Sequence, residues 1–490
     1  MAVSEETFFL DPAFEGTLQQ QIQSLVAEGI LSGRLRSGEK LPSTRKLARH
    51  LGISRITVTL AYTELQADDY ILSKGRSGYY VSENAPQPRL TGKPVEDTGS
   101  VDWDRFLSTK FSEAELFRKP ANWQSYRYPF IYGQADPTLF DHANWRLCAL
   151  QALGLRDFEA MTTDYFERDD PRLVEFIARH SLPRRGILAA PDEILVTLGA
   201  QNALWLAAEV LLQLGRTAVI ESPCYPGLRN ILERRDCEIQ TVPVDAGGLP
   251  VEDIPSGADV VFTTPSHHCP TSVTMPLERR RAMLERAAED DFVIVEDDYE
   301  FEMSFVTPPS PALKSLDKEG RVIHIGSFSK SLFPGLRLGY IVGSRTFIRE
   351  ARALRAAVLR HPPGHVQRTA AYFMSLGHYD ALIKRTARAL STRRQVMTEA
   401  IRSNGLTIAG EGKGGSSFWM RAPEGVDTVT LTEALKEDGV LIEPGSAFFP
   451  GPERPTEFYR LAYSSIPKDR IPEGIARIAK ALGRFQDARP

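Results

Sequence analysis

The sequence predicts a chain of two folded parts: a small N-terminal winged helix-turn-helix and a large α/β domain with a mainly parallel sheet. Helix-period patterns fill most of residues 12–82 and end in a short hairpin pattern. From about residue 126 onward, short Val- and Ile-rich runs alternate with amphipathic helical stretches. Residues 83–125 between them are rich in Pro and Gly, as linkers are, apart from a short helix expected near Trp103–Leu107.

Composition places the chain among globular proteins. Hydrophobic residues make up 42% and charged residues 25% of its 490 positions, and no apolar run reaches the roughly 18 residues of a membrane span. The first residues lack the basic start of a signal peptide. We therefore expect a cytoplasmic protein with no membrane partner.

Cysteine spacing and charge narrow the partners. The four cysteines lack CxxC spacing and no Cys/His cluster matches a zinc site, so we expect reduced thiols and no bound metal. The net charge of −4 does not indicate a nucleic-acid binder as a whole. Residues 31–60, however, hold seven basic residues against one acid, Glu39, and such a local patch can bind phosphate.

The N-terminal elements follow in order. An apolar period from Leu18 to Ile30 predicts the first helix. Ser43 is a good N-cap for a second helix, TRKLARHLG, and Ser54 for a third, RITVTLAYTELQADDY. The β-type residues of YILSKGRSGYYV bracket a glycine-containing turn, which predicts a two-stranded wing.

This layout suits DNA reading, because a helix can enter the major groove with its N-terminal residues toward the base edges. The candidate base contacts are Ser54, Arg55, Thr57 and Thr59. The candidate contacts to phosphate, or to the minor groove at the wing tip, are Arg45, Lys46 and Arg76. The alternative is a structural helical bundle with a solvated basic face.

The residues themselves resemble the GntR-type winged helix over about positions 14–82. GEKLPSTRKLA, then LGISRITV, then the aromatic-ended wing carry the resemblance. It implies that operator DNA is a partner.

In the large domain, the segment IGSFSKSLFPGLRLGY contains Ser327, Ser329, Lys330 and Arg337. A lysine amine can condense with an aldehyde to an imine, while hydroxyls and a guanidinium can hold a phosphate. The segment resembles the cofactor-binding segment of fold-type I enzymes that use pyridoxal 5'-phosphate (PLP). The resemblance implies that Lys330 forms the Schiff base.

In the upstream segment FVIVEDDYE, an apolar strand pattern ends in an acidic run. A carboxylate there can pair with the protonated pyridine nitrogen of the cofactor. The resemblance gives this role to Asp297, and gives Tyr299 a bond to the cofactor's phenolic oxygen. Spacing alone leaves Glu296 and Asp298 as alternatives, as well as a solvated loop.

Other strand ends add candidates. In TLGAQNAL, the backbone N–H groups of Gly199, Ala200 and Gln201 can face the phosphate at a helix N-terminus. Tyr225 can stack on the pyridine ring, and Arg460 stands where aminotransferases grip a substrate carboxylate. The structural alternatives are an ordinary strand-turn-helix junction, a core aromatic and a surface arginine. The resemblance to class I aminotransferases covers about residues 126–485.

One stretch departs from those enzymes. They place Asn before Pro in an Asn-Pro-x-Gly segment, whereas this chain has His267, His268 and Cys269 before Pro270. We therefore expect PLP binding without efficient transamination, and treat His267 and His268 as candidate effector contacts. No carboxylate or cysteine set completes a metal site with them.

A GntR-type module over 12–82, a linker over 83–125 and an aminotransferase-like domain over 126–490, ending in a smaller α+β subdomain, resemble the MocR subfamily of bacterial regulators. The resemblance implies a head-to-tail homodimer. A small amine or amino acid would displace Lys330 by aldimine exchange and shift the population of domain arrangements. Candidate effectors are taurine, γ-aminobutyrate and ectoine-derived amino acids, and the chain would control the related metabolic genes.

The sequence thus favours a transcription factor over an enzyme, with room for a residual half-transamination. One alternative is a working PLP aminotransferase with an accessory DNA-binding module. The other is a DNA-binding protein whose large domain is a cofactor-free dimerisation platform.

Overall fold

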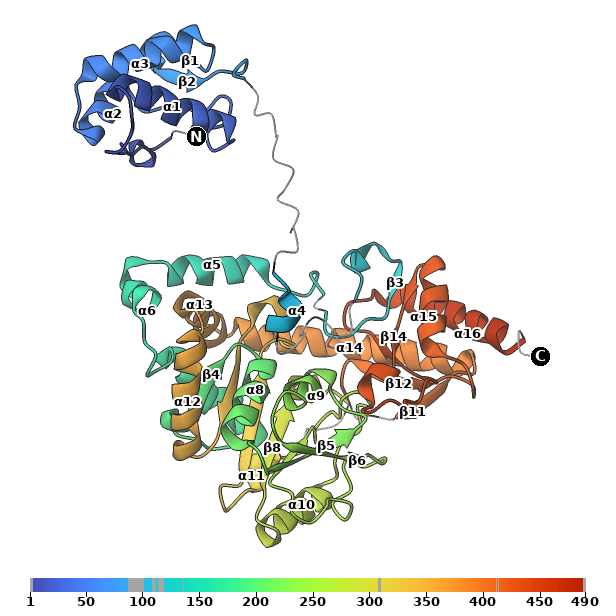
Figure 1. Cartoon of the computed structure of the whole chain (residues 1–490). Coiled ribbons are helices and arrows are strands. Elements are labelled where there is room, and N and C mark those ends of the chain that lie inside the picture. Colours follow the sequence, from blue (N-terminus) through green and yellow to red (C-terminus); the bar gives the residue numbers. More distant parts are fainter. Residues whose placement is uncertain are drawn as a thin grey trace. The chain divides into compact units, whose positions relative to one another are not determined.

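The computed structural model describes residues 3–86, 101–107, 112, 119–134, 136–306, 310–410, 412 and 414–487. The chain divides into two compact units, Met1–Lys110 and Phe111–Pro490 (Figure 1). This single boundary lies inside the segment 83–125, so the three-part division stays a prediction.

The first unit is a three-helix module with a hairpin. Its main elements are α1 (Leu18–Leu31), α2 (Thr44–Leu51), α3 (Arg55–Ala67), β1 (Ile71–Ser73), β2 (Tyr79–Val81) and the short α4 (Trp103–Phe106). Val26, Leu47 and Val58, one from each of the first three helices, are fully buried against one another in a common core. The hairpin pairs Ile71 with Val81, so the predicted helix-turn-helix and wing are confirmed.

Local signals explain the helix ends. Ser43 Oγ accepts from the backbone N–H of Lys46 at the start of α2, and Gly52 ends that helix in the left-handed region, with φ 67°. The expectation that α3 runs on to Tyr70 is wrong. The helix ends at Ala67 because Asp69 adopts a φ of 59°, which a right-handed helix excludes.

The second unit is built on a seven-stranded sheet of order β4-β10-β9-β8-β7-β5-β6. The strands are β4 (Ile194–Thr197), β5 (Thr217–Ser222), β6 (Glu238–Pro243), β7 (Val260–Thr263), β8 (Val293–Asp298), β9 (Val322–Ser327) and β10 (Gly339–Val342). β5 to β9 are mutually parallel, whereas β10 runs antiparallel to both of its neighbours. The apolar runs EILVT, TAVIES, DVVFTTP, FVIVEDD and RVIHIGSFS, which are typical of buried strands, form β4, β5, β7, β8 and β9.

Helices cover both faces of this sheet, as Figure 1 shows. The helices of this part of the chain are α5 (His142–Ala152), α6 (Phe158–Thr162), α7 (Pro171–Phe176), α8 (Ala200–Leu211), α9 (Pro226–Leu232), α10 (Leu277–Glu289), α11 (Leu313–Leu316), α12 (Arg345–Leu359) and α13 (Gly364–Ser375), of which α5 and α6 pack on α13. Val295 joins the core under α8, whereas its neighbour Ile294 joins the core under α10. This alternation is that of a strand buried on both faces.

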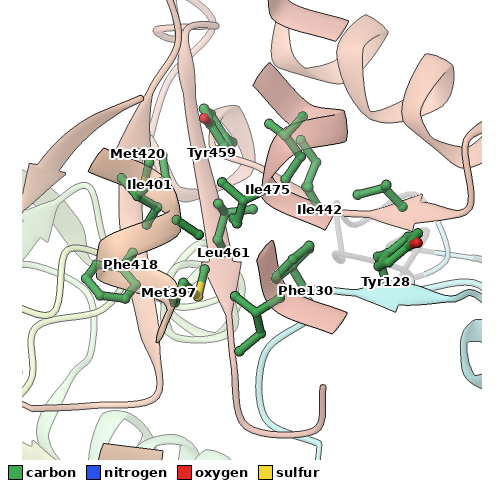
Figure 2. Close-up of a cluster of buried hydrophobic side chains, with 14 of the residues drawn as sticks. Tyr128, Phe130, Met397, Ile401, Phe418, Met420, Ile442, Tyr459, Leu461 and Ile475 are labelled. Atoms are coloured by element: carbon green, nitrogen blue, oxygen red, sulfur yellow. The ribbon is translucent and has the colours of Figure 1, made fainter. Parts of the chain in front are cut away.

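The chain ends in a smaller α+β part around a four-stranded antiparallel sheet of order β11-β12-β15-β14. Its elements are α14 (His378–Ser403), β11 (Thr407–Gly410), β12 (Ser417–Arg421), α15 (Thr428–Glu437), β13 (Val440–Leu441), β14 (Glu443–Pro444), β15 (Phe458–Ala462) and α16 (Ile471–Asp487). Figure 2 shows its core, in which Tyr459 and Leu461 of β15 pack with Phe130. Phe130 follows β3 (Tyr128–Pro129), which pairs with β13.

Within the described ranges, no helix has both the length and the apolar character needed to cross a membrane.

Candidate functional site

Lys330 lies in the turn that follows β9, close to the segment after β3. Its Nζ is 4.1 Å from the ring centroid of Tyr132. Gly133 has a φ of 73°, and a Cβ there would come within 2.3 Å of the lysine Nζ. Glycine at 133 therefore keeps open the space that the lysine needs.

Three acidic residues end β8, and the structure separates them. The Glu296 carboxylate accepts from the backbone N–H groups of Leu313 and Lys314 and lies 3.0 Å from His324 Nδ1. Asp298 forms a buried ion pair with Arg185 at 2.5 Å. Both are therefore engaged in holding the fold.

Asp297 differs from its two neighbours. Asp297 lies on the opposite face of the strand from Glu296 and Asp298, and it is 8% exposed. Its buried Oδ1 has no hydrogen-bond partner among the described residues. Burial and then the adjacent Asp298 raise the pKa of the Asp297 carboxyl to about 8. An unpartnered buried carboxyl is costly on its own and is suited to a cationic N–H group of a ligand.

The phosphate-holding residues predicted from the sequence also come together. Gly199, with φ 81°, is the N-cap of α8, so the N–H groups of Ala200 and Gln201 begin the helix. Arg337 donates to the Leu198 carbonyl and lies 3.4 Å from where a Cβ at Gly199 would stand. This helix N-terminus with an exposed guanidinium beside it fits a dianion.

Two serines at the end of β9 have different roles. Ser327 Oγ accepts from the backbone N–H of Ser329, which shapes the turn before the lysine. Ser329 Oγ is buried and lacks a hydrogen-bond partner within the described part of the chain. It can therefore donate to a bound ligand.

The two candidate tyrosines have partners of their own. Tyr225 precedes α9, and its hydroxyl donates to Gln201 Oε1 over 3.2 Å. Tyr225 also lines a small cavity with Asp297 and Glu221, and its stacking on a ring stays a prediction. Tyr299 donates to the His267 carbonyl over 2.9 Å, so its bond to a cofactor oxygen stays a prediction.

Arg460 is a buried residue of the site and not a surface arginine. Tyr459 and Leu461 point into the core, so the strand alternation turns Arg460 to the opposite face. Its Nε donates to Glu443 Oε2 over 2.6 Å, and its Cζ lies 4.1 Å from the Tyr132 ring centroid. Burial acts to lower the pKa of Arg460, but Glu443, Cys269 and Tyr132 together raise it above its usual value, so the guanidinium stays charged.

Three residues of this site were missed by the sequence analysis: Tyr132, Glu300 and Glu443. Glu300 accepts from the Tyr132 hydroxyl over 3.0 Å and from Ser416 Oγ over 2.5 Å. Burial lowers the pKa of Lys330 to about 8, although Glu300 acts against that shift. The only sequence signals were the glycine after Tyr132 and the position of Glu300 directly after Tyr299.

The His-His-Cys stretch is buried beside the site. His268 Nδ1 lies 2.7 Å from Thr271 Oγ1, and His267 Nδ1 has no hydrogen-bond partner among the described residues. Burial lowers the pKa of both imidazoles, so both are neutral at pH 7. Cys269 lies 4.0 Å from Arg460, and burial raises the pKa of its thiol to about 11. No cluster of three or more metal-binding side chains occurs in the described ranges.

In the first unit, the candidate DNA contacts lie on α2, on and just before α3, and in the wing. Arg45 and Lys46 are exposed in the first turn of α2, and Arg55 is exposed at the start of α3. Ser54 Oγ caps α3 by accepting from the N–H of Ile56. Thr57 and Thr59 are half-buried. Arg76 lies in the turn of the wing, and its side chain is outside the described residues.

Two families match this chain, each over one of its parts. The family of bacterial regulatory proteins called gntR matches residues 18–81. The class I and II aminotransferases match residues 154–478.

Similar proteins combine both parts. The HTH-type transcriptional regulator TauR of Rhodobacter capsulatus is 57% identical over 483 residues, which cover 98% of this chain and 100% of that protein. The probable rhizopine catabolism regulatory protein MocR of Rhizobium meliloti is 29% identical over 96% of this chain and 95% of its own length.

Among solved structures, the α-aminoadipate aminotransferase LysN of Thermus thermophilus superposes with a TM-score of 0.72 at 25% identity. The superposition covers 79% of this chain and 100% of the LysN chain. The LysN structure contains N-(5'-phosphopyridoxyl)-L-leucine. The kynurenine aminotransferase of Pyrococcus horikoshii gives a TM-score of 0.71 at 27% identity, over 79% of this chain and 99% of its own. The fold-type I expectation is therefore confirmed.

Proposed function

Since this chain belongs to the MocR-type transcriptional regulators, which join a GntR helix-turn-helix to a class I and II aminotransferase domain, we propose that it controls transcription in response to a small amine that competes with Lys330 for PLP. The proposal rests on the site around Lys330 and on the DNA-binding module.

The proposal is carried by one observation: the second unit has residues suited to three groups of PLP, namely its phosphate, its pyridine nitrogen and its aldehyde. The α8 N-terminus with Arg337 suits a phosphate, and the unpartnered Asp297 suits a pyridinium N–H. The ε-amino group of Lys330 suits an aldehyde. With a pKa of about 8, a useful fraction of this amine is neutral and nucleophilic near pH 7.5.

When bound, PLP supplies an aldehyde with which any primary amine can condense. This chain's residues decide which amine is admitted. Lys330 Nζ and Arg460 Cζ each lie 4.1 Å from the Tyr132 ring centroid, so no more than twice that distance separates them. That spacing suits a short amine with an anionic end, such as taurine or γ-aminobutyrate. The name of TauR favours taurine.

A sensing role is favoured over turnover by one substitution of the aminotransferase pattern. The Asn that precedes Pro in the enzymes is replaced by Cys269, whose thiol stays protonated because burial raises its pKa to about 11. It cannot offer the amide N–H that Asn offers a cofactor. We also retain the head-to-tail homodimer and the cytoplasm as proposals, since a regulator must reach operator DNA.

The test uses full-length protein loaded with PLP and a duplex that it selects from a random pool. Taurine is expected to change the cofactor absorption band once, in proportion to protein, and to change affinity for that duplex. Repeated turnover with a 2-oxo acid would instead make the chain an aminotransferase. A band that every amine changes equally, without effect on DNA affinity, would contradict sensing.

A further inference from the structure

The outward face of α3 is unusually apolar for a helix that meets DNA. Ile56 is 69% exposed and Leu60 is 49% exposed, although the opposite face of the same helix is buried through Val58, Ala61 and Tyr62. Ile56 and Leu60 are one helical turn apart, so they point in the same direction. Exposed large apolar side chains grouped on one helix face indicate a binding surface.

Two threonines lie on the same face of α3, and their hydroxyl groups already donate hydrogen bonds within the helix. Thr59 Oγ1 donates to the Arg55 carbonyl over 2.9 Å, and Thr63 Oγ1 donates to the Thr59 carbonyl over 2.9 Å. Their hydroxyl hydrogens are thus used within the helix, which leaves a methyl group and an accepting oxygen on each. Ser54 Oγ is engaged as the N-cap of α3. Arg55 is the basic residue at the start of this helix and can still donate hydrogen bonds to a partner.

The basic residues near this apolar face indicate which kind of partner it binds. Arg45, Lys46 and Arg49 of the preceding helix are exposed, and so is Arg55. Basic side chains on a neighbouring helix beside an apolar helix face are complementary to a DNA groove, where phosphates flank the base edges. In the major groove, the apolar group that a base presents is the C5-methyl of thymine.

We propose that Ile56 and Leu60 read thymine methyl groups in the major groove, and that they set operator preference together with hydrogen bonding by Arg55. This inference rests on the proposed DNA-binding function. It adds two apolar residues, which would determine the preferred DNA sequence, to the base contacts predicted from the amino-acid sequence.

The experiment uses the full-length protein and the tightest duplex that it selects from a random pool. Each thymine is replaced in turn by deoxyuridine, which removes only the methyl group. At one or more thymines, the Kd is expected to rise about fourfold, the factor that corresponds to one buried methyl group. Ile56→Ala or Leu60→Ala is expected to weaken binding of the thymine duplex and to abolish the uracil effect at that position.

Leu18→Ala is the matched control, because Leu18 is a leucine of the same unit with a similar exposure of 46%. It should retain both the affinity and the uracil effect. A duplex bound equally well with every thymine replaced would overturn the inference and leave DNA binding intact. Failure to select any duplex would overturn the proposed function itself. Variants at Ile56 and Leu60 that bind DNA normally but change the oligomeric state would identify a protein-docking face instead, and would also overturn the inference.

Discussion

Arg460 and Glu443 form a buried ion pair between the neighbouring strands β15 and β14. The carboxylate occupies the Nε edge of the guanidinium, and the ring centroid of Phe448 lies 4.7 Å from the guanidinium carbon. The pair fixes the direction of the remaining N–H groups, which can meet an effector anion. Glu443 is thus a positioning residue for Arg460.

Removing the charge of Arg460 should abolish the effector response without loss of PLP or DNA binding. Arg460→Met alone leaves Glu443 buried and unpaired, which should destabilise the protein by about 3–5 kcal/mol. Combining Arg460→Met with Glu443→Gln should recover most of that loss in thermal unfolding. If the double variant still responds to taurine in the absorption titration, Arg460 does not bind the anion.

Asp297→Asn should weaken PLP binding about 10- to 100-fold, because it removes the carboxyl that would pair with the protonated pyridine nitrogen and become charged beside it. The fold should tolerate the change, since Asp297 Oδ1 accepts no hydrogen bond from the described part of the chain. Asp298→Asn is the matched contrast. It breaks the buried pair with Arg185 and should lower the free energy of unfolding by about 3–5 kcal/mol. Equal effects of both variants on PLP affinity would contradict the assignment.

The raised pKa of Asp297 predicts how the stability of the cofactor-free protein depends on pH. The folded-state pKa is about 8 against 3.8 for an ordinary carboxyl, so between these values the folded state binds the extra proton. The stability from this group is fully present below pH 4 and falls as the pH rises toward 8. Thermal unfolding from pH 5 to 8 should show a shallower decline in Asp297→Asn; an unchanged slope would contradict the burial of an ionisable Asp297.

Arg55→Ala should weaken binding of the selected duplex about tenfold and leave PLP binding intact, because its side chain is exposed in a separate compact unit. Fluorescence anisotropy and the cofactor absorption band measure the two effects. Loss of both together would show that the two units do not act separately.

Much of the architecture could be predicted from local signals. Caps such as Ser43 and Gly52 act over a few residues, so the helices of the first unit follow from the sequence. Strands β5, β7, β8 and β9 are apolar runs buried on both faces. Strand β6 gives a weaker signal, because half of its residues, EIQTVP, are polar and it lies at the sheet edge. Strand β10 also gives a weak signal, because it has only four residues, GYIV.

The site was harder to predict where it depends on distant segments. Asp297 could not be separated from Glu296 and Asp298 by spacing, because their difference lies in partners such as Arg185 and His324 elsewhere in the chain. Tyr132 lies beside Lys330 although the two are far apart in the sequence, and the preceding β3 pairs with β13, more than 300 residues away. No local pattern encodes such contacts. The residues on strand ends were predictable because parallel strands bring their carboxyl ends together.

The most direct test of the account is the absorption spectrum of the purified full-length protein with added PLP, beside that of Lys330→Ala. We expect the wild-type protein to show an imine band that taurine alters, and the variant to lack that band while it still binds the selected duplex. A wild-type protein that stays colourless with PLP, or a Lys330→Ala variant with the same band and the same taurine response, would contradict sensing through Lys330.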